Sequence, residues 1–132
     1  MPKTSIVSTP QEADGVVLID VSNLAFRMAF AHQRLTTSAK KPSGHIYGSI
    51  RSIVALLRND LDEGAWCLCF CYDDKRARAV RQAISPEYKA NREAHPPVAL
   101  EQFKRTKDRL VADGRLLWSV PGYEADDLIA TA

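Results

Sequence analysis

Three short runs of apolar residues constrain the fold of this chain more than any other feature of its sequence. They cover Val16–Ile19, Trp66–Tyr72 and Leu116–Val120, and each has the length and composition of a buried β-strand. Between and after them lie stretches with apolar residues at steps of three and four, the spacing of an amphipathic helix. Strands that alternate with helices predict an α/β fold with a mainly parallel sheet and right-handed crossovers.

Four helices are expected around these strands, the first with Ser22 or Asn23 as its N-cap. Residues 1–14 are polar and show no periodicity, so we expect a flexible leader before a folded region over residues 15–132. A basic segment, residues 75–97, contains three prolines and therefore cannot form one continuous helix. The four helices introduced above are expected from about Leu24 to Gln33, from Ile46 to Leu61, from Val98 to Asp113 and from Glu124 onward.

Composition excludes several classes of protein. With 45% hydrophobic and 26% charged residues in 132, the chain is neither disordered nor fibrous. It has no apolar run of the roughly 20 residues that span a bilayer and no segment typical of a signal peptide, so no membrane partner and a cytoplasmic location are expected. The three cysteines lie at alternate positions of one expected strand, which indicates core residues in a reducing compartment. They are Cys67, Cys69 and Cys71.

Acidic residues follow each of the three expected strands. Because ligands of an open parallel sheet bind at the carboxyl ends of its strands, we expect these acids to converge there. A single acid at such a position more often caps a helix, and two acids in a first helical turn also complement the helix dipole without any metal. The acids are, in chain order, Asp20, then Asp73 and Asp74, then Glu124, Asp126 and Asp127.

Carboxylates crowded together raise each other's pKa unless a cation neutralises them. The set contains no histidine, so it offers hard oxygen ligands, which suit Mg²⁺ or Mn²⁺ rather than zinc or copper. Such ions beside a phosphate can activate water and stabilise the leaving oxygen of a phosphodiester. The expected cofactor is therefore Mg²⁺ or Mn²⁺.

The net charge of +2 hides two opposite regions. Residues 75–109 contain ten lysines and arginines against four acids, while the rest of the chain contains eight against twelve. A basic region beside clustered acids favours a polyanionic partner, although a solvated helical face has the same composition.

Four sequence motifs occur in an order that resembles the 5′→3′ exonuclease and flap-endonuclease family, which includes the 5′-nuclease domain of bacterial DNA polymerase I and phage flap endonucleases. The motifs are LIDVSN (residues 18–23), KPSGHIYGSIRSI (41–53), DDKRARAVR with SPEYKANR (73–92) and PGYEADDLIATA (121–132). The resemblance implies a three-layer, PIN-like domain that acts in DNA replication and repair. Its members cut DNA, and in some cases RNA, at flaps or free 5′ ends with divalent metals.

The resemblance also implies roles for individual residues. Asp20, Asp74, Glu124, Asp126 and Asp127 match the family's metal-binding acids. Among these, Asp74 is chosen over Asp73 by counting back from the Tyr88–Lys89 pair. Asp74 and Asp126 are thereby placed among the catalytic residues.

The basic segment would form an arch over the substrate. Lys89 and Arg92 match basic residues of the family's arch that help to organise the scissile phosphate, and Arg81 matches an arginine near its base. Tyr88 could stack on a base, or it could be a packing residue. Tyr47, beside Gly48, matches a pair near the active site and is a second candidate for stacking.

Family members continue beyond the last motif with further strands and a region that grips duplex DNA. We therefore expect the N-terminal part of a 5′-nuclease domain, apparently truncated, with one sheet edge uncovered. Such a chain could be a truncated form, one half of a split protein completed by a second polypeptide, or a reduced protein. It is expected to be weak or inactive on its own. The alternative function is a non-catalytic DNA-binding or protein-interaction module, and an RNA-cleaving PIN toxin ranks last.

Overall fold

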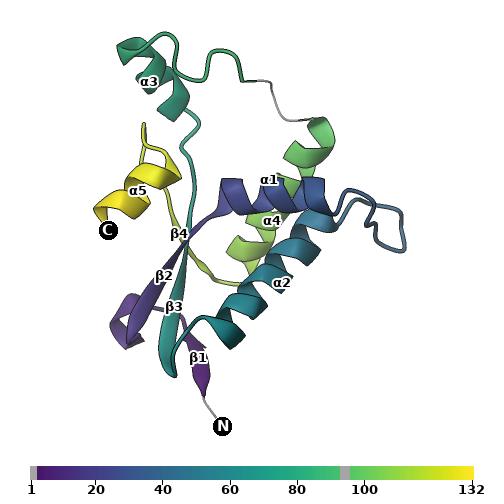
Figure 1. Ribbon diagram of the computed structural model, residues 1–132, viewed down its shortest axis with the longest axis vertical. Helices are drawn as coiled ribbons and strands as arrows, with labels where there is room; N and C mark the ends of the chain where they lie inside the picture. Colours follow the sequence, from purple (N-terminus) through teal and green to yellow (C-terminus); the bar gives the residue numbers. More distant parts are fainter. Residues whose placement is uncertain (1–2, 93–95) are drawn as a thin grey trace.

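A computed structural model describes residues 3–92 and 96–132 of the chain. Residues 93–95, which fall inside the expected basic segment, lie outside the described residues. Figure 1 shows the strands at the centre of the molecule, with helices on both sides. The elements in chain order are β1 (Thr4–Val7), the 3₁₀-helix η1 (Pro10–Glu12), β2 (Gly15–Asp20), α1 (Val21–Ala31), α2 (Gly44–Asn59), β3 (Gly64–Cys71), α3 (Ala77–Ile84), α4 (Pro97–Ala112), β4 (Leu116–Trp118) and α5 (Ala125–Thr131).

Strand β3 is the centre of a parallel sheet. Strand β2 pairs with it along one edge, with Asp20 opposite Cys71. On the other edge β1 pairs with residues 64–67, and β4 pairs with residues 69–71. Since β1 and β4 follow one another along the same edge, the described sheet is three strands wide. This arrangement confirms the mainly parallel α/β fold.

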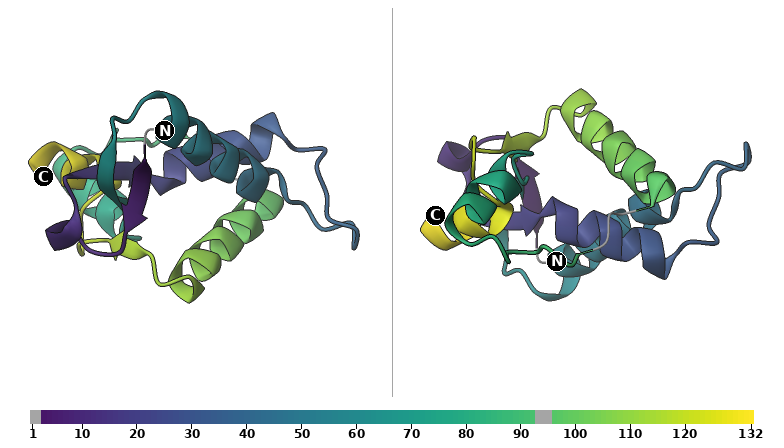
Figure 2. Two further views of the ribbon diagram at one scale, coloured as in Figure 1. Left: turned by 90° about the horizontal axis from the view of Figure 1, so that it is seen from below. Right: turned by 90° about the horizontal axis from the view of Figure 1, so that it is seen from above.

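The side chains of β3 alternate between two cores. Leu68, Phe70 and Tyr72 face a core formed with α1, α2 and α4, whereas Cys69 and Cys71 pack with Ala125 and Leu128 of α5. Figures 1 and 2 show α5 and the group of α1, α2 and α4 on opposite sides of the strands. The three-layer architecture is therefore confirmed, and the three cysteines are buried, unbridged core residues.

The prediction of a flexible leader over residues 1–14 is wrong for half of that segment, which forms regular structure. Thr4–Val7 form β1, Pro10–Glu12 form η1, and the side chain of Ile6 packs against the larger core. The edge of β3 offers unpaired peptide groups, and β1 satisfies four residues of it. Only two of its four residues, Ile6 and Val7, are apolar, so no apolar run marked this strand in the sequence.

Three further expectations need correction. The N-cap of α1 is Asp20 rather than Ser22 or Asn23, because its carboxylate accepts a hydrogen bond from the Asn23 N–H at 3.0 Å. The basic segment contains a helix, α3, that no expected element covered. The third expected strand is also shorter than its apolar run, since β4 ends at Trp118.

Gly48 allows α1 and α2 to pack closely. A Cβ atom at this position would lie 2.6 Å from the Met28 Sδ and 2.8 Å from the Met28 Cβ. The glycine beside Tyr47 therefore has a packing role. In the described part of the chain, no helix combines the length and the apolar character needed to cross a membrane.

The packing of β1 gives a first testable prediction. Replacing Ile6 with Ala should lower the free energy of unfolding by about 1–2 kcal/mol, because a partly buried side chain leaves the core. Urea unfolding followed by circular dichroism would measure the change. Ser5→Ala, at an exposed position of the same strand, is the control and should be close to neutral. If both substitutions had equally negligible effects on the free energy of unfolding, residues 4–7 would behave as a flexible leader and the prediction would be wrong.

Candidate functional site

Asp20 stands where the end of β2 meets the start of α1. Burial raises the pKa of its carboxyl group, and the neighbouring carboxylates of Asp126 and Asp73 raise it further, while the Asn23 N–H acts in the opposite direction. Asp20, Asp73 and Asp126 come from the ends of β2 and β3 and from the first turn of α5. The structure thus brings together acids from three different segments, as the strand order predicted.

Asp73 and Asp74 point to different partners although they are adjacent. Asp73 accepts a hydrogen bond from the Ala125 N–H at 2.7 Å and so ties the end of β3 to the first residue of α5. Asp74 instead pairs with the Arg76 guanidinium at 3.0 Å and accepts the Gly122 N–H at 3.0 Å. The Arg76 and Gly122 hydrogen bonds hold the pKa of Asp74 well below its usual range. Asp73, rather than the Asp74 that the family spacing selects, is the one of the two whose charge raises the pKa of Asp20.

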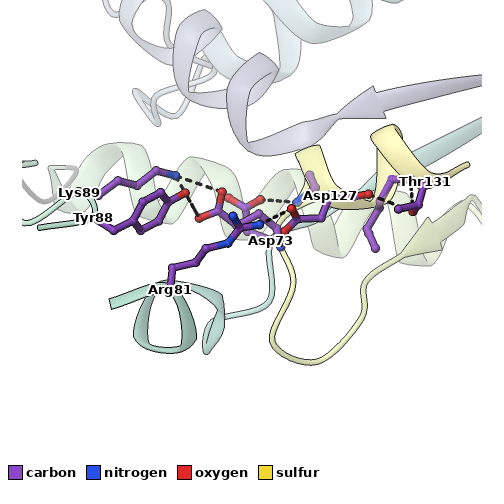
Figure 3. Close-up of polar contacts among 9 residues, drawn as sticks. Asp73, Arg81, Tyr88, Lys89, Asp127 and Thr131 are labelled. Atoms are coloured by element: carbon purple, nitrogen blue, oxygen red, sulfur yellow. Dashed lines mark hydrogen bonds and ion pairs between the residues drawn. The ribbon is translucent and has the colours of Figure 1, made fainter. Parts of the chain in front are cut away.

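Glu124 and Asp127, at the N-terminus of α5, are already paired with basic residues. The Glu124 Oε1 accepts hydrogen bonds from the Tyr88 hydroxyl at 2.7 Å and from the Lys89 Nζ at 3.1 Å. Asp127 forms an ion pair with Arg81, and its second oxygen accepts the Glu124 N–H at 2.9 Å. Figure 3 shows Arg81, Tyr88 and Lys89 reaching these acids from the basic segment.

These contacts set the protonation of the two acids. Burial raises the pKa of Glu124, but the hydrogen bonds from Tyr88 and Lys89 outweigh burial, and the net pKa lies below its ordinary value. The Arg81 hydrogen bond, with the Glu124 N–H, lowers the pKa of Asp127. Both carboxylates are therefore charged at neutral pH, and the charges of Lys89 and Arg81 compensate them.

Tyr88 connects the acids to the bases. Its hydroxyl donates to Glu124, while its ring has the Arg81 guanidinium carbon 5.7 Å and the Lys89 Nζ 5.0 Å from its centroid. Both distances allow cation–π attraction. In this arrangement the ring contacts two cations, so the base-stacking role stays a prediction.

The structure does not bring Tyr47 to the carboxylates. Tyr47 packs edge-to-face against His32, the C-cap of α1, and its hydroxyl accepts a hydrogen bond from Arg51 at 3.1 Å. Asp20 is the N-cap at the other end of α1, about 18 Å from His32 along the helix axis at 1.5 Å per residue. Arg92 is exposed, and its N–H donates to the Lys89 carbonyl, so its backbone belongs to the same turn as Lys89.

The donor chemistry of the site fits a divalent cation. Asp20, Asp73 and Asp126 are hard oxygen donors, and the ion pairs found within residues 3–92 and 96–132 include none of them. Their spacing is wider than a ligand shell, since these same ranges contain no group of three side chains close enough to hold a metal ion. The site has the charge for a cation, and its carboxylates would have to move to coordinate one.

Sequence reasoning missed three residues that contact the site. Arg76 pairs with Asp74, and Arg78 and Gln82 donate to the backbone of the turn that carries Tyr88 and Lys89. A helical reading of residues 77–84 places positions 78 and 82 on one face, and this spacing was the available signal.

Comparison with known proteins identifies the family. Residues 15–132 match the family described as "5′-3′ exonuclease, N-terminal resolvase-like domain". The chain is 34% identical over 116 residues to the thermostable DNA polymerase I of Thermus thermophilus, and 36% identical over 118 residues to DNA polymerase I of Mycobacterium tuberculosis. Each match covers 88% of this chain and 13% of the relative. The chain therefore belongs to this 5′-3′ exonuclease family and spans about one eighth of the length of these relatives.

The opposite pKa shifts of the acids give a second prediction. Asp20→Asn should raise the urea midpoint at pH 7 in EDTA, because the raised pKa of Asp20 means that its ionisation opposes folding. The asparagine oxygen can still accept the Asn23 N–H. The gain should vanish as the pH falls toward about 3, where the acid is protonated in both states.

Glu124→Gln is the matched substitution with the opposite sign. The lowered pKa of Glu124 means that its charge stabilises the fold above the pKa of the unfolded chain, about 4.3, and that this stability is lost as the pH falls through the folded value. Its midpoint should fall at pH 7 and approach that of the wild type in acid. A destabilised Asp20→Asn at pH 7 would contradict this account of the charges.

Proposed function

We propose that this chain, as a member of the 5′-3′ exonuclease family, contributes the metal-binding and phosphate-contacting part of a nuclease that hydrolyses DNA at flaps or free 5′ ends. The observation that carries the proposal is the meeting of two groups at one edge of the sheet. The carboxylate of Asp20, at the end of β2, interacts with those of Asp73, after β3, and Asp126, in the first turn of α5. At the same helix terminus, Glu124 and Asp127 pair with Lys89 and Arg81 of the basic segment. Acids that hold a cation next to bases that hold a phosphate are what metal-assisted phosphodiester hydrolysis requires.

Asp20, Asp73 and Asp126 are the residues that would hold Mg²⁺ or Mn²⁺ in this arrangement. Such an ion supplies an activated water and neutralises charge on the phosphate. The chain's own contribution is to collect these carboxylates at one edge, where Asp73 also holds the N-terminus of α5 through the Ala125 N–H.

Lys89 and Arg81 would bind the phosphate. The Lys89 ammonium lies 3.1 and 3.3 Å from the two Glu124 oxygens, and Arg81 is engaged with Asp127. A phosphate that approaches these cations must therefore compete with two carboxylates. Where it succeeds, Glu124 and Asp127 lose their partners and become available as further oxygen ligands.

A second candidate function has one observation in its favour. The described residues contain no group of three side chains close enough to hold a metal ion. This favours a DNA-binding or protein-interaction module that lacks catalysis. This alternative predicts binding of flap DNA that is unaffected by EDTA and by loss of the carboxylates.

Substitution of Asp126 separates these two functions. Asp126→Asn should reduce Mg²⁺- or Mn²⁺-dependent cleavage of a fluorescent 5′-flap DNA by at least about 10–100-fold, the range for groups that hold or orient a metal. Asp113→Asn, at the far end of α4, is the control and should leave the rate unchanged. DNA binding that resists EDTA and Asp126→Asn but weakens in Lys89→Ala, without metal-dependent cleavage, would establish the non-catalytic module.

Asp73 and Asp74 can be compared in the same assay. Asp73→Asn should weaken Mn²⁺ binding and cleavage, because the charge of Asp73 acts on Asp20. Asp74→Asn should chiefly lower thermal stability, because Asp74 fixes the turn around Arg76 and Gly122. Titration calorimetry with Mn²⁺ and a thermal melt measure the two effects. The reverse pattern would return the ligand role to Asp74, as the family spacing implies.

A further inference from the structure

The segment after α3 folds into a series of turns that carries Tyr88 and Lys89. The Tyr88 N–H donates to the Ser85 carbonyl at 2.9 Å, and the Ala90 N–H donates to the Glu87 carbonyl at 3.2 Å. Lys89 has a φ of 51°, in the left-handed region that side chains other than glycine rarely adopt. Local turns do not explain why a lysine keeps this conformation, so contacts from outside the segment must hold it.

Helix α3 provides those contacts from one face. The Gln82 Nε2 donates to the Tyr88 carbonyl at 3.0 Å, and the Arg78 guanidinium donates to the Lys89 carbonyl. Residues 78, 81 and 82 are three and four positions apart, so they project from the same side of the helix. The side chain of Arg81 does not bond to this segment and instead donates to the Asp127 carboxylate. Two consecutive carbonyl groups are therefore tied to α3 at the point where the backbone is strained.

We propose that Arg78 and Gln82 are positioning residues, which hold the backbone of Tyr88 and Lys89 so that the Lys89 ammonium points to the edge with the carboxylates. Figure 3 shows the orientation that these contacts would maintain: the Tyr88 hydroxyl and the Lys89 ammonium both point toward α5. This inference rests on the proposed function, in which Lys89 contacts a phosphate. Arg78 and Gln82 act through Lys89 and need not touch the substrate.

The chemistry of the two donors suits this task. The Gln82 amide is partly buried and offers two N–H donors, and the Arg78 guanidinium offers several N–H donors in one rigid plane. If either donor is removed, the lysine can relax toward ordinary backbone angles. Its ammonium then leaves Glu124 more often and becomes more accessible to solvent.

The test measures the accessibility of Lys89 and needs neither DNA nor metal. The purified protein is acetylated briefly with acetic anhydride, and the rate at each lysine is read by mass spectrometry of its peptides. Gln82→Met and Arg78→Met should increase the rate at Lys89 by about two- to tenfold, the factor expected for loss of one hydrogen bond. Arg78→Lys keeps a donor and should remain closer to the wild type.

Controls separate positioning from general stability. Gln33→Met makes the same chemical change at an exposed position, and Lys104 and Lys107 on α4 report on the rest of the fold. Unchanged acetylation of Lys89 in the folded Gln82→Met and Arg78→Met variants would overturn the proposal. An equal increase at all lysines would also overturn it, because the two residues would then support only the overall fold.

Cleavage of flap DNA provides an arm that depends on the proposed function. Gln82→Met should lower kcat in the wild-type background and cause no further loss in Lys89→Ala, because its effect passes through that lysine. Additive losses would contradict positioning. Because acetylation is measured without substrate, metal-dependent cleavage that persists unchanged in Asp126→Asn would refute the proposed function and leave the positioning result to stand or fall independently.

Discussion

The parallel pairing of β2 with β3 is the constraint on which the rest of the site depends. The register places Asp20 opposite Cys71, and Trp118 of β4 pairs with the same Cys71 from the other edge. Three strands thus end at one level, and the chain leaves each of them toward the same space. Because a strand rises about 3.3 Å per residue, a register shift of two residues would move Asp20 about 7 Å along β3, away from Asp73. The acids converge because the backbone pairing fixes where each strand ends along β3.

The converged acids form two groups with opposite electrostatics. Glu124 and Asp127 have lowered pKa values because Tyr88, Lys89 and Arg81 compensate their charges. Asp20 has a raised pKa because burial and two carboxylates surround it. A cation bound to the first group must displace basic side chains, whereas a cation bound to the second group relieves repulsion that already exists. The charge distribution therefore favours the side of Asp20 for the first cation.

The sequence predicted what depends on long, regular patterns and missed what depends on short segments. The strands at Val16–Ile19 and Trp66–Tyr72 were clear because they are continuous apolar runs, and the long helices because they repeat their apolar spacing. Strand β1 has only two apolar residues, and the helical pattern of α3 lies among basic residues. Spacing placed the acids at the strand ends and, counted back from Tyr88 and Lys89, favoured Asp74 over Asp73, but it did not show which of the two would act on Asp20. That choice depends on how the backbone turns after β3 and on the partner that Arg76 offers to Asp74.

The position of Tyr88 bears on how the acidic and basic regions work together. The sequence indicated an acidic pocket for metal and a basic strip for phosphate as separate features, yet here they neutralise each other in the Lys89–Glu124 and Arg81–Asp127 ion pairs. A base that stacked on the ring face next to Arg81 or Lys89 would have to displace that cation, to which the proposed function gives the phosphate. On that face, stacking and the proposed phosphate binding would compete. The hydroxyl bond to Glu124, by contrast, leaves both cations in place, so the geometry favours Tyr88 as the link between the two charged regions.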